Sequence, residues 1–397
     1  MHTVGIDIGK LSHVAAIMDE DHNFLIPSYK FANTKEGFES FLVKCEVVGA
    51  HIAASRIAIE ATGHYWLNLY AFLKERGASE LIVLNPLQSK ALRNLDIRGA
   101  KTDTVDAKHI ARVVSFNAHG DQHPLNEDTY ALRQLTRLRI ELVREVADAK
   151  RRIVRLLDLV FPEFQSIFSN MFGVTGRAFM ERYTTPEEIA KLPRSRIEAL
   201  IARLSRGKLN PSETADSLKQ AARNSIGLRF ATDAFTLELR LLLKQIAFLE
   251  EQIAEIEGAM EPYKEKLPET ELLMSIPGIS FILAATIGAE IGDIAKFSKA
   301  DALVAYAGMD AKVVQSGEFT GTKTRLSKRG SPYLRWAYGY AAFVARVQDP
   351  ALKKIFEKKK DQGKPYGIAL SAVVHKLLHI TYAVLKQKKP YECHLPN

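Results

Sequence analysis

The chain has 397 residues, 47% of them hydrophobic, which is enough for two or three domains that each bury an apolar core. This composition excludes a disordered or fibrous protein. Lys and Arg number 55 and Asp and Glu 46, so the formal net charge of +9 favours a polyanionic partner without identifying one.

The cysteines and the N-terminus indicate the compartment. Cys45 and Cys393 lie at opposite ends of the chain and fit neither a disulfide framework nor a metal-ligand cluster, which indicates a reducing, intracellular environment. The opening MHTVGIDIGK lacks the pattern of a signal peptide, and no window approaches the roughly 18 uninterrupted apolar residues of a membrane span. We therefore expect a soluble, cytoplasmic protein without a membrane partner.

The first part of the chain, about residues 1–120, predicts an α/β domain with a mixed sheet. Three short runs rich in β-branched and aromatic residues, separated by turn-prone residues, indicate an antiparallel meander. Helical and strand patterns alternate after it. The predicted strands are 3–8, 13–18, 24–31, 56–60 and 81–84, and the predicted helices are 35–48, 65–76 and 88–94.

Two segments with heptad spacing follow, beginning near residue 129. The spacing is unbroken over 235–260, whereas Arg139 interrupts one of the two rows over 135–160. At 1.5 Å per residue each helix would be about 45 to 50 Å long. We interpret the two as the arms of an antiparallel coiled coil with a helical cap at 163–227; two ordinary long helices in a bundle are the alternative.

Beyond residue 268 the composition shifts to Gly, Ala and basic residues. The segment 272–291 combines an apolar helix, a Pro-Gly turn and a second apolar helix, which is a helix-hairpin-helix pattern. After a loop-rich stretch at 308–332, helices are predicted at 333–347, 351–361 and 367–386.

The predicted fold class is therefore α/β plus all-α. We expect three domains: a ribonuclease-H-like mixed sheet at 1–120, coiled-coil arms with their cap at 121–267, and a mostly helical domain at 268–397.

Four carboxylates are candidates for one metal site in the first domain. Asp7 lies within the first strand between two glycines, and Glu60 ends a later strand. Asp103 and Asp106 stand three apart on the first turn of a predicted helix, so they share a face. Carboxylates that converge raise one another's pKa unless a counter-charge is present, and hard divalent cations such as Mg²⁺ supply it in phosphoryl transfer.

Each acid also has a structural alternative. Asp103 could be a helix N-cap with Asp106 completing a variant capping box, Asp7 a turn residue, and Glu60 a solvated carboxylate. The order of the acids along the chain favours the functional interpretation. The first lies on a strand of the meander, the second on a later strand and the last two on a helix, which is the order in which a ribonuclease-H-like fold presents its acidic residues.

Sugar kinases and actin-like ATPases are a competing class, because they also begin with a strand and a G-x-D-x-G turn like Gly5–Gly9. Those proteins repeat the fold and have a second phosphate-binding loop downstream, whereas in this chain segments with heptad spacing follow the first domain. Neither a GxxxxGK[ST] nor a GxGxxG loop is present in the sequence.

Ser316 is the candidate nucleophile in the last domain. It precedes Gly317 in a segment too rich in glycine for a helix, so we expect an exposed hydroxyl on a loop; a turn serine is the alternative. The basic residues that follow are suited to nucleic-acid phosphates and are Lys323, Arg325, Lys328, Arg329 and Arg335.

Two further features of the last domain could bind a ligand. Backbone N–H groups from Gly278 to Phe281 could bind a nucleic-acid phosphate at a helix N-terminus, although simple helix packing is an equal alternative. His375 and His379 are four apart on the last helix, but no Glu accompanies them as a general base, so a zinc site is not expected.

Six motifs occur in order along the chain: GIDIGK, IEATGHYW around Glu60, KTDTVDAKHIAR, IPGIS, AYAGMDAKVVQSGEFTGTKTRLSKRGSPYLR and DPALKKIFEKKKDQGKPYGIALSAVVHKLL. Over nearly its full length the sequence resembles the insertion-sequence DEDD transposases, now described as bridge-RNA-guided recombinases.

This resemblance implies a RuvC-like domain whose acidic tetrad, Asp7, Glu60, Asp103 and Asp106, binds Mg²⁺, and a transposase domain whose nucleophilic serine is Ser316. It implies a covalent phosphoserine link to DNA before strand exchange. It also implies that a structured guide RNA selects the donor and target DNA. In the family the active site joins the RuvC-like domain of one subunit to the serine domain of another, within a dimer or tetramer.

The sequence departs from the family pattern in two places. Gln315 precedes Ser316 where many members have a second serine, so Ser327 and Ser331 stay alternatives for the nucleophile. The cap at 163–227 is longer than in compact members, which leaves its role in holding RNA open.

Two other classes of function stay open. A RuvC-like structure-selective nuclease would use the four acids with water as the nucleophile and would form no protein–DNA adduct. A non-enzymatic RNA-binding protein would tolerate loss of all four carboxylates.

Overall fold

The computed structural model describes residues 1–61, 63–84, 102–116, 126–312, 315–316, 319–320 and 325–393, with the backbone alone at 116, 311, 312, 315, 316, 319, 320 and 325. The chain forms two compact units, Met1–Leu125 and Asn126–Asn397. The helix predicted at 88–94 lies outside the described residues.

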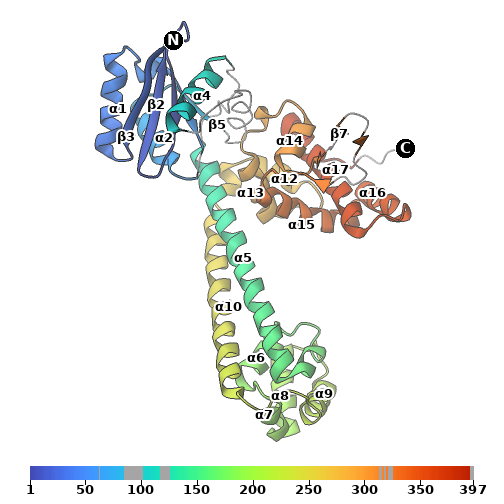
Figure 1. Ribbon diagram of the computed structural model, residues 1–397. Coiled ribbons are helices and arrows are strands. Elements are labelled where there is room, and N and C mark those ends of the chain that lie inside the picture. The colour runs from blue at the N-terminus through green and yellow to red at the C-terminus, as the bar shows by residue number, and fades with distance from the viewer. Residues whose placement is uncertain are drawn as a thin grey trace. The chain divides into compact units, whose positions relative to one another are not determined.

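The first unit contains a five-stranded mixed sheet with the strand order β3-β2-β1-β4-β5 (Figure 1). The β1–β2 and β2–β3 pairs are antiparallel, whereas β1–β4 and β4–β5 are parallel. The predicted meander is therefore confirmed, and every predicted strand is found within one residue of its expected ends. The strands are β1 (Thr3–Asp7), β2 (Ser12–Met18), β3 (Phe24–Ala32), β4 (Arg56–Glu60) and β5 (Glu80–Leu84).

Helices cover both faces of this sheet (Figure 1). Helices α1 (Lys35–Val47) and α2 (Trp66–Glu75) pack on one face, where they bury Ile6 and Ile59 from the central strands. Helix α4 (Asp103–Phe116) packs on the other face. Because side chains alternate along a strand, each central strand presents one row to α1 and α2 and the other row to α4.

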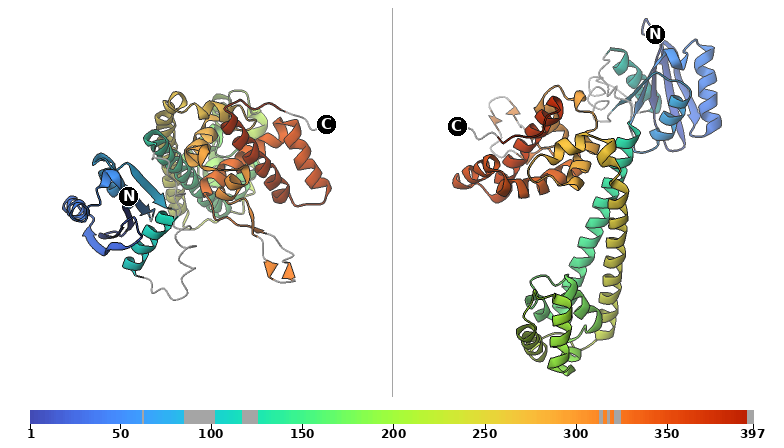
Figure 2. Two further views of the ribbon diagram at one scale, coloured as in Figure 1. Left: turned by 90° about the horizontal axis from the view of Figure 1, so that it is seen from above. Right: turned by 180° about the vertical axis from the view of Figure 1, so that it is seen from behind.

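In the second unit, two long helices lie side by side, α5 (Glu127–Val160) and α10 (Thr232–Met260) (Figures 1 and 2). Ion pairs Arg139–Glu257 and Arg152–Glu238 join them, so they run antiparallel. Arg139, which interrupts the heptad row, thus bridges the two helices rather than breaking their contact. The predicted heptad residues of α10 that are buried are Leu239, Leu242, Ile246, Leu249, Ile256 and Met260.

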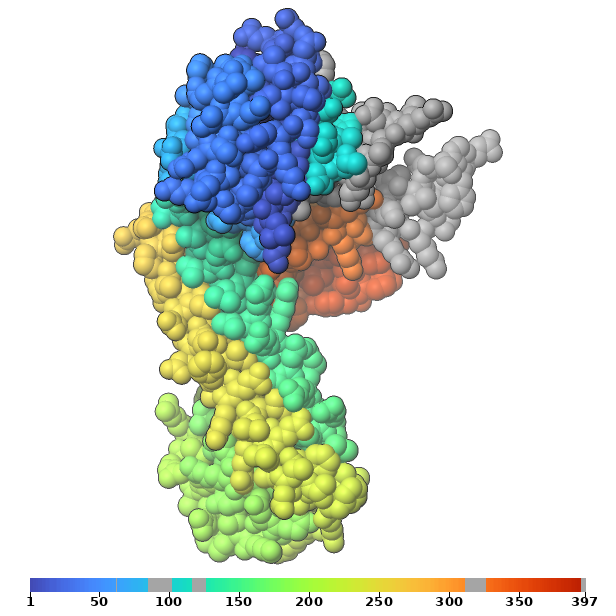
Figure 3. Space-filling model, turned by 60° about the vertical axis from the view of Figure 1, so that its left-hand side comes forward, coloured from blue at the N-terminus to red at the C-terminus, as the bar shows by residue number. Residues whose placement is uncertain are grey.

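A helical cap joins the far ends of α5 and α10 (Figures 2 and 3). Its core contains Phe161, Phe164 and Phe179, all at most 1% exposed. The predicted helical character of this segment is confirmed. Its helices are α6 (Val174–Arg182), α7 (Pro186–Lys191), α8 (Arg194–Ser205) and α9 (Pro211–Arg223).

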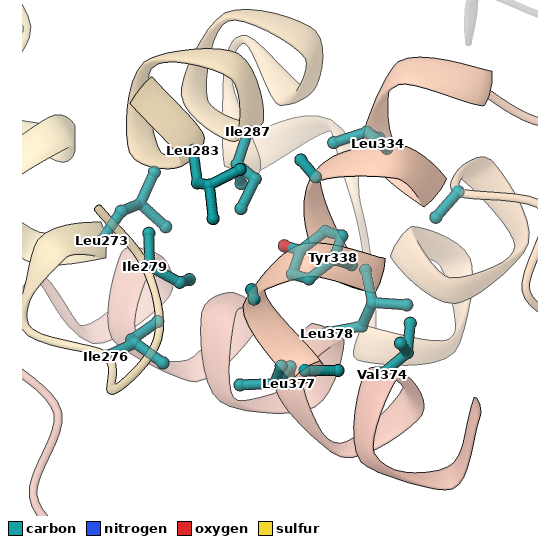
Figure 4. Close-up of a cluster of buried hydrophobic side chains, with 14 of the residues drawn as sticks. Leu273, Ile276, Ile279, Leu283, Ile287, Leu334, Tyr338, Val374, Leu377 and Leu378 are labelled. Atoms are coloured by element: carbon teal, nitrogen blue, oxygen red, sulfur yellow. The ribbon is translucent and has the colours of Figure 1, made fainter. Parts of the chain in front are cut away.

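The rest of the second unit is mostly helical, around a core that encloses Tyr338 (Figure 4). Its helices are α11 (Tyr263–Lys266), α12 (Glu269–Met274), α13 (Phe281–Ile291), α14 (Ala300–Tyr306), α15 (Pro332–Gln348), α16 (Pro350–Asp361) and α17 (Tyr366–Gln387). Four two-residue strands occur in the stretch predicted to be loop, and they are β6 (Ala311–Lys312), β7 (Gln315–Ser316), β8 (Phe319–Thr320) and β9 (Arg325–Leu326).

Helix α17 is long and apolar enough to cross a membrane by length and composition. Its apolar residues have a packing explanation within this unit, however, because Val373, Val374, Leu377 and Leu378 belong to the buried core (Figure 4). Together with α15, this helix supplies much of that core.

Candidate active site

Asp7 and Glu60 lie next to each other because β1 and β4 are parallel neighbours. Ile6 is paired with Ile59, so the next position on each strand holds one of the two acids, at the carboxyl ends of both strands. Side-chain alternation directs both acids to the same face as Gly5, which is the face that α4 covers. Only 8% of Glu60 is exposed.

Helix α4 brings the other two acids to this edge of the sheet. It can do so because Gly5 lacks a side chain: a Cβ there would lie 2.2 Å from the Ala111 backbone nitrogen and 2.4 Å from the Ala107 carbonyl oxygen. Asp103 and Asp106 occupy the first turn of this closely packed helix. Asp106 is 7% exposed, whereas Asp103 is exposed to solvent.

The start of α4 settles the structural alternative for Asp103. The Thr102 hydroxyl accepts a hydrogen bond from the Val105 backbone N–H at 3.3 Å, and Asp103 is the first residue of the helix. The N-cap alternative for Asp103 is therefore wrong. Both aspartates lie at the helix N-terminus, where the helix dipole favours negative charge.

The electrostatics of Asp7 show that the four acids converge. Burial, together with the negative charges of Asp106, Asp103 and Glu60, raises the pKa of Asp7 to about 7, against a smaller lowering by the Ile8 backbone N–H. Each of the three other acids thus acts on Asp7. A cluster of this kind is destabilised by its own charge at neutral pH unless a cation or proton is bound.

Ser316 lies in a short hairpin of the second unit. It belongs to β7, pairs with Phe319 of β8, and is described here by its backbone alone. The base of the hairpin is the β6–β9 pair. Below that base Gly308 and Gly330 meet so closely that a Cβ on Gly330 would lie 1.9 Å from the Tyr306 carbonyl oxygen. The hairpin therefore starts from a closely packed backbone crossing.

The other two serines of this region have structural roles. The Ser327 hydroxyl donates to the Asp310 carboxylate. The Ser331 hydroxyl accepts from the Leu334 backbone N–H, which caps α15, and donates to Glu290 at 2.9 Å. Both hydroxyls are therefore held in hydrogen bonds, and the choice of Ser316 over Ser327 and Ser331 stays a prediction.

Comparison with known families identifies the chain at both ends. A model of the IS110 DEDD group, described as a transposase, matches residues 4–162, and a model described as the transposase IS116/IS110/IS902 family matches residues 270–357. The chain belongs to the IS110 family of transposases. It is therefore a DNA-cleaving and rejoining enzyme.

Relatives of this IS110-family transposase align along almost its whole length. An insertion element IS116 protein of Streptomyces clavuligerus is 26% identical over 97% of this chain and 95% of its own. The mini-circle putative transposase for IS117 of Streptomyces coelicolor is 24% identical over 98% and 94%. A pilin gene-inverting protein of Moraxella bovis is 24% identical over 98% and 97%.

The IS110-family assignment implies a divalent metal, and the donor set of the first unit fits one. All four acids offer carboxylate oxygens, the ligands that hard divalent ions prefer. The pKa of Asp7 is raised first by burial and then by the negative charges of the other three acids, and a bound divalent cation would offset that repulsion.

The residues of this transposase that were predicted to contact phosphate differ in exposure and in hydrogen bonding. Lys328 and Arg329 are exposed beside the hairpin base. Arg335 instead donates to the carbonyl oxygens of Ala307 at 3.1 Å and Gly330 at 2.8 Å, so it braces the backbone crossing. Lys323 lies outside the described residues, and the side chain of Arg325 is not described.

Gly278 has a structural requirement of its own. Its φ is +84°, and a Cβ there would lie 2.5 Å from the Ala341 carbonyl oxygen of α15. The packing alternative considered for this turn is therefore sufficient to explain the glycine, while its use in binding phosphate stays a prediction.

Sequence reasoning missed a buried ion pair next to the serine region. Glu290 of α13 is 1% exposed and accepts two hydrogen bonds from Arg137 of α5, at 2.6 and 3.1 Å. It also accepts from Ser331, so it joins α5 and α13 to the start of α15. The available signal was one acid in the apolar helix FILAATIGAEI, because a buried carboxylate needs a partner.

Proposed function

We propose that this IS110-family transposase is a guide-RNA-directed, Mg²⁺-dependent recombinase that links itself to DNA through Ser316. The observation that carries the proposal is the convergence of four carboxylates, expressed in the pKa of Asp7 near 7. Among the described acids of the first unit, this cluster combines burial with mutual repulsion. Perturbed carboxylates of this kind are typical of functional sites.

Asp7, Glu60, Asp103 and Asp106 are the residues that would hold the metal. Bound there, Mg²⁺ would supply charge neutralisation and Lewis-acid polarisation of a scissile phosphate. The first unit contributes rigid placement, because two acids end paired strands and two begin a helix packed against Gly5. Such preorganisation lowers the barrier to phosphoryl transfer without further rearrangement.

Ser316 supplies the nucleophile. Its Oγ forms a bond to phosphorus as the bond from phosphorus to a deoxyribose oxygen breaks; the serine loses a proton and the leaving oxygen gains one. Rejoining reverses this exchange with the hydroxyl of another strand and restores the free serine. Lys328 and Arg329, which are exposed, would offset charge on the phosphate.

Several finer features belong to the same proposal. The strand order of the first unit supports a RuvC-like fold, and the antiparallel α5–α10 pair supports a coiled coil. The α12–turn–α13 segment supports a helix-hairpin-helix that contacts phosphate through Gly278. We propose three functional domains at 1–120, 121–267 and 268–397, a dimer or tetramer, donor and target DNA with a guide RNA as partners, and action in the cytoplasm.

Covalent trapping tests the mechanism. Purified protein with its co-purified RNA is incubated with DNA that carries the element's ends, and the products are run on a denaturing gel. We expect a protein–DNA adduct with the natural chain and none with Ser316→Ala. Ser371→Ala is the matched serine control, because the Ser371 hydroxyl only donates to the Gly367 carbonyl on α17.

Asp7→Ala separates the remaining alternatives. We expect it to abolish recombination while RNA binding is kept. DNA cutting by Ser316→Ala without any adduct would favour a RuvC-like nuclease that uses water. Wild-type recombination by either variant would contradict a site that needs both the acids and the serine.

A further inference from the structure

Helices α14 and α17 bring together three potential metal ligands in the second unit. These are Asp301 of α14 and His375 and His379 of α17, whose ligand atoms all lie within 4.8 Å of one another. The two imidazole rings are stacked with centroids 4.7 Å apart, as expected for residues four apart on one helix face. The third ligand comes from a different helix, so the sequence spacing of the two histidines could not predict it.

The hydrogen bonding of His379 is incomplete. Its Nε2 atom is shielded from solvent and has no hydrogen-bond partner among the described residues. Asp301 Oδ1 is 3.5 Å from that nitrogen, beyond the usual 2.7–3.2 Å of an N–H···O hydrogen bond. A polar atom removed from water without a partner is destabilising, so the two groups would gain from an ion bound between them.

The backbone around the three ligands is held by contacts that need no metal. Leu303 of α14 and Val374 and Leu378 of α17 are all buried in the same apolar core. The Tyr382 hydroxyl, one turn after His379, lies 3.0 Å from the carbonyl oxygen of Ser298, just before α14. The two helices are thus fixed against each other, and only the side chains of the three ligands need to adjust to bind an ion.

We propose that Asp301, His375 and His379 bind Zn²⁺, with a fourth position open to water. Zn²⁺ takes imidazole nitrogen and carboxylate oxygen in four-coordinate sites, and two histidines at i and i+4 chelate it on one helix face. Two nitrogen ligands disfavour Mg²⁺, which prefers oxygen. The absence of a neighbouring Glu argues only against a peptidase-type catalytic zinc, because a binding site needs no general base.

Such an ion would tie the start of α14 to the middle of α17. Helix α14 ends at Tyr306, and the chain then passes through Gly308 into the base of the short-strand region. The site therefore acts as a clamp on the segment that leads into β6, at a place where α14 has only seven residues of its own. The acids of the first unit offer oxygen ligands alone, so the two sites differ in the class of ion they select.

Cobalt substitution tests the site in the full chain. Protein freed of metal by chelator is titrated with Co²⁺, which gives an intense visible band when it is tetrahedral with nitrogen ligands and a weak one in an octahedral oxygen site. We expect one equivalent of the intense band, displaced by Zn²⁺, and a higher melting temperature with Zn²⁺. His375→Ala and His379→Ala should abolish the band, and Asp301→Asn should weaken Zn²⁺ binding by about tenfold or more.

Two controls keep the test sharp. His51→Ala removes an exposed histidine that pairs only with Glu46, and it should leave the band unchanged. Asp7→Ala should also leave it unchanged, which separates this site from the acid cluster. Metal-free melting temperatures of the His375 variant should match the natural chain, because the side chain is exposed. Equal Zn²⁺ affinity in the natural chain and the two histidine variants would overturn the proposal.

Discussion

The close contact between Gly5 and α4 predicts a large effect of Gly5→Ala on activity. The new Cβ would lie 2.2 Å from the Ala111 nitrogen and 2.4 Å from the Ala107 carbonyl oxygen. Both are backbone atoms of a helix, so no side-chain rotation relieves the overlap. Restoring ordinary contact near 3.5 Å requires α4 to move away from β1 by about 1 Å.

This displacement has two separable consequences. Overpacking of a closely fitted contact costs about 1–3 kcal/mol of unfolding free energy. Asp103 and Asp106 move with α4, away from Asp7 and Glu60, and a misplacement of about 1 Å can lower a phosphoryl-transfer rate by about 100-fold. The loss of activity should therefore exceed the loss of folded protein at the assay temperature.

Two measurements check the Gly5 prediction. Recombination between DNA substrates that carry the element's ends is measured with Mg²⁺, and thermal unfolding is followed by circular dichroism. Gly258→Ala is the matched control: Gly258 lies exposed in α10 with no atom near its Cβ position, so alanine should preserve activity and slightly stabilise the helix. Wild-type recombination and melting by Gly5→Ala would refute the reasoning.

Three further predictions concern the two units separately. Gly330→Ala should lower the melting temperature and adduct formation together, because its Cβ would lie 1.9 Å from the Tyr306 carbonyl oxygen; paired melting and adduct assays check this. Glu290→Gln removes the negative charge that pairs with Arg137 and should cost about 3 kcal/mol, the low end for a buried pair because 37% of the Arg137 side chain is exposed. Urea denaturation measures that loss, and a change below about 0.5 kcal/mol, the size of a neutral surface substitution, would contradict it. In metal-free protein the raised pKa of Asp7 contributes stability that is fully present below its ordinary pKa of 3.8 and is lost as pH rises through about 7. Melting temperatures measured in chelator across this pH range should therefore fall less steeply with pH in Asp7→Asn than in the natural chain.

The acid cluster was predictable because it depends on local patterns and on one rule of sheet geometry. Short runs rich in β-branched residues located β1 and β4, and the ends of adjacent parallel strands meet at one edge of a sheet. That rule brings Asp7 to Glu60 without knowledge of any side-chain contact. The i, i+3 spacing likewise put Asp103 and Asp106 on one helix face.

The contacts that fix the sites were not predictable, because they join segments far apart in the chain. A lone Glu290 in an apolar helix signals a buried partner, but nothing in its neighbourhood points to Arg137 on another helix. The same holds for Asp301, which reaches the two histidines only through the packing of α14 on α17. Periodicity reports which face of an element is buried, not what covers it.

The fold has to hold together four carboxylates that repel one another. Repulsion opposes the approach of α4 to β1, because the charges of Asp106 and Asp103 on α4 add to burial in raising the pKa of Asp7 on β1. Packing opposes it: Ile110 and Val114 of α4 are at most 1% exposed against Ala58 and β5, and complete burial of such a side chain contributes about 1.5–3 kcal/mol. Gly5 allows the helix to come close enough for that packing to form. The apolar face of α4 therefore holds the four acids together in the metal-free protein. A cation that binds there relieves their repulsion, and this relief adds to its binding free energy.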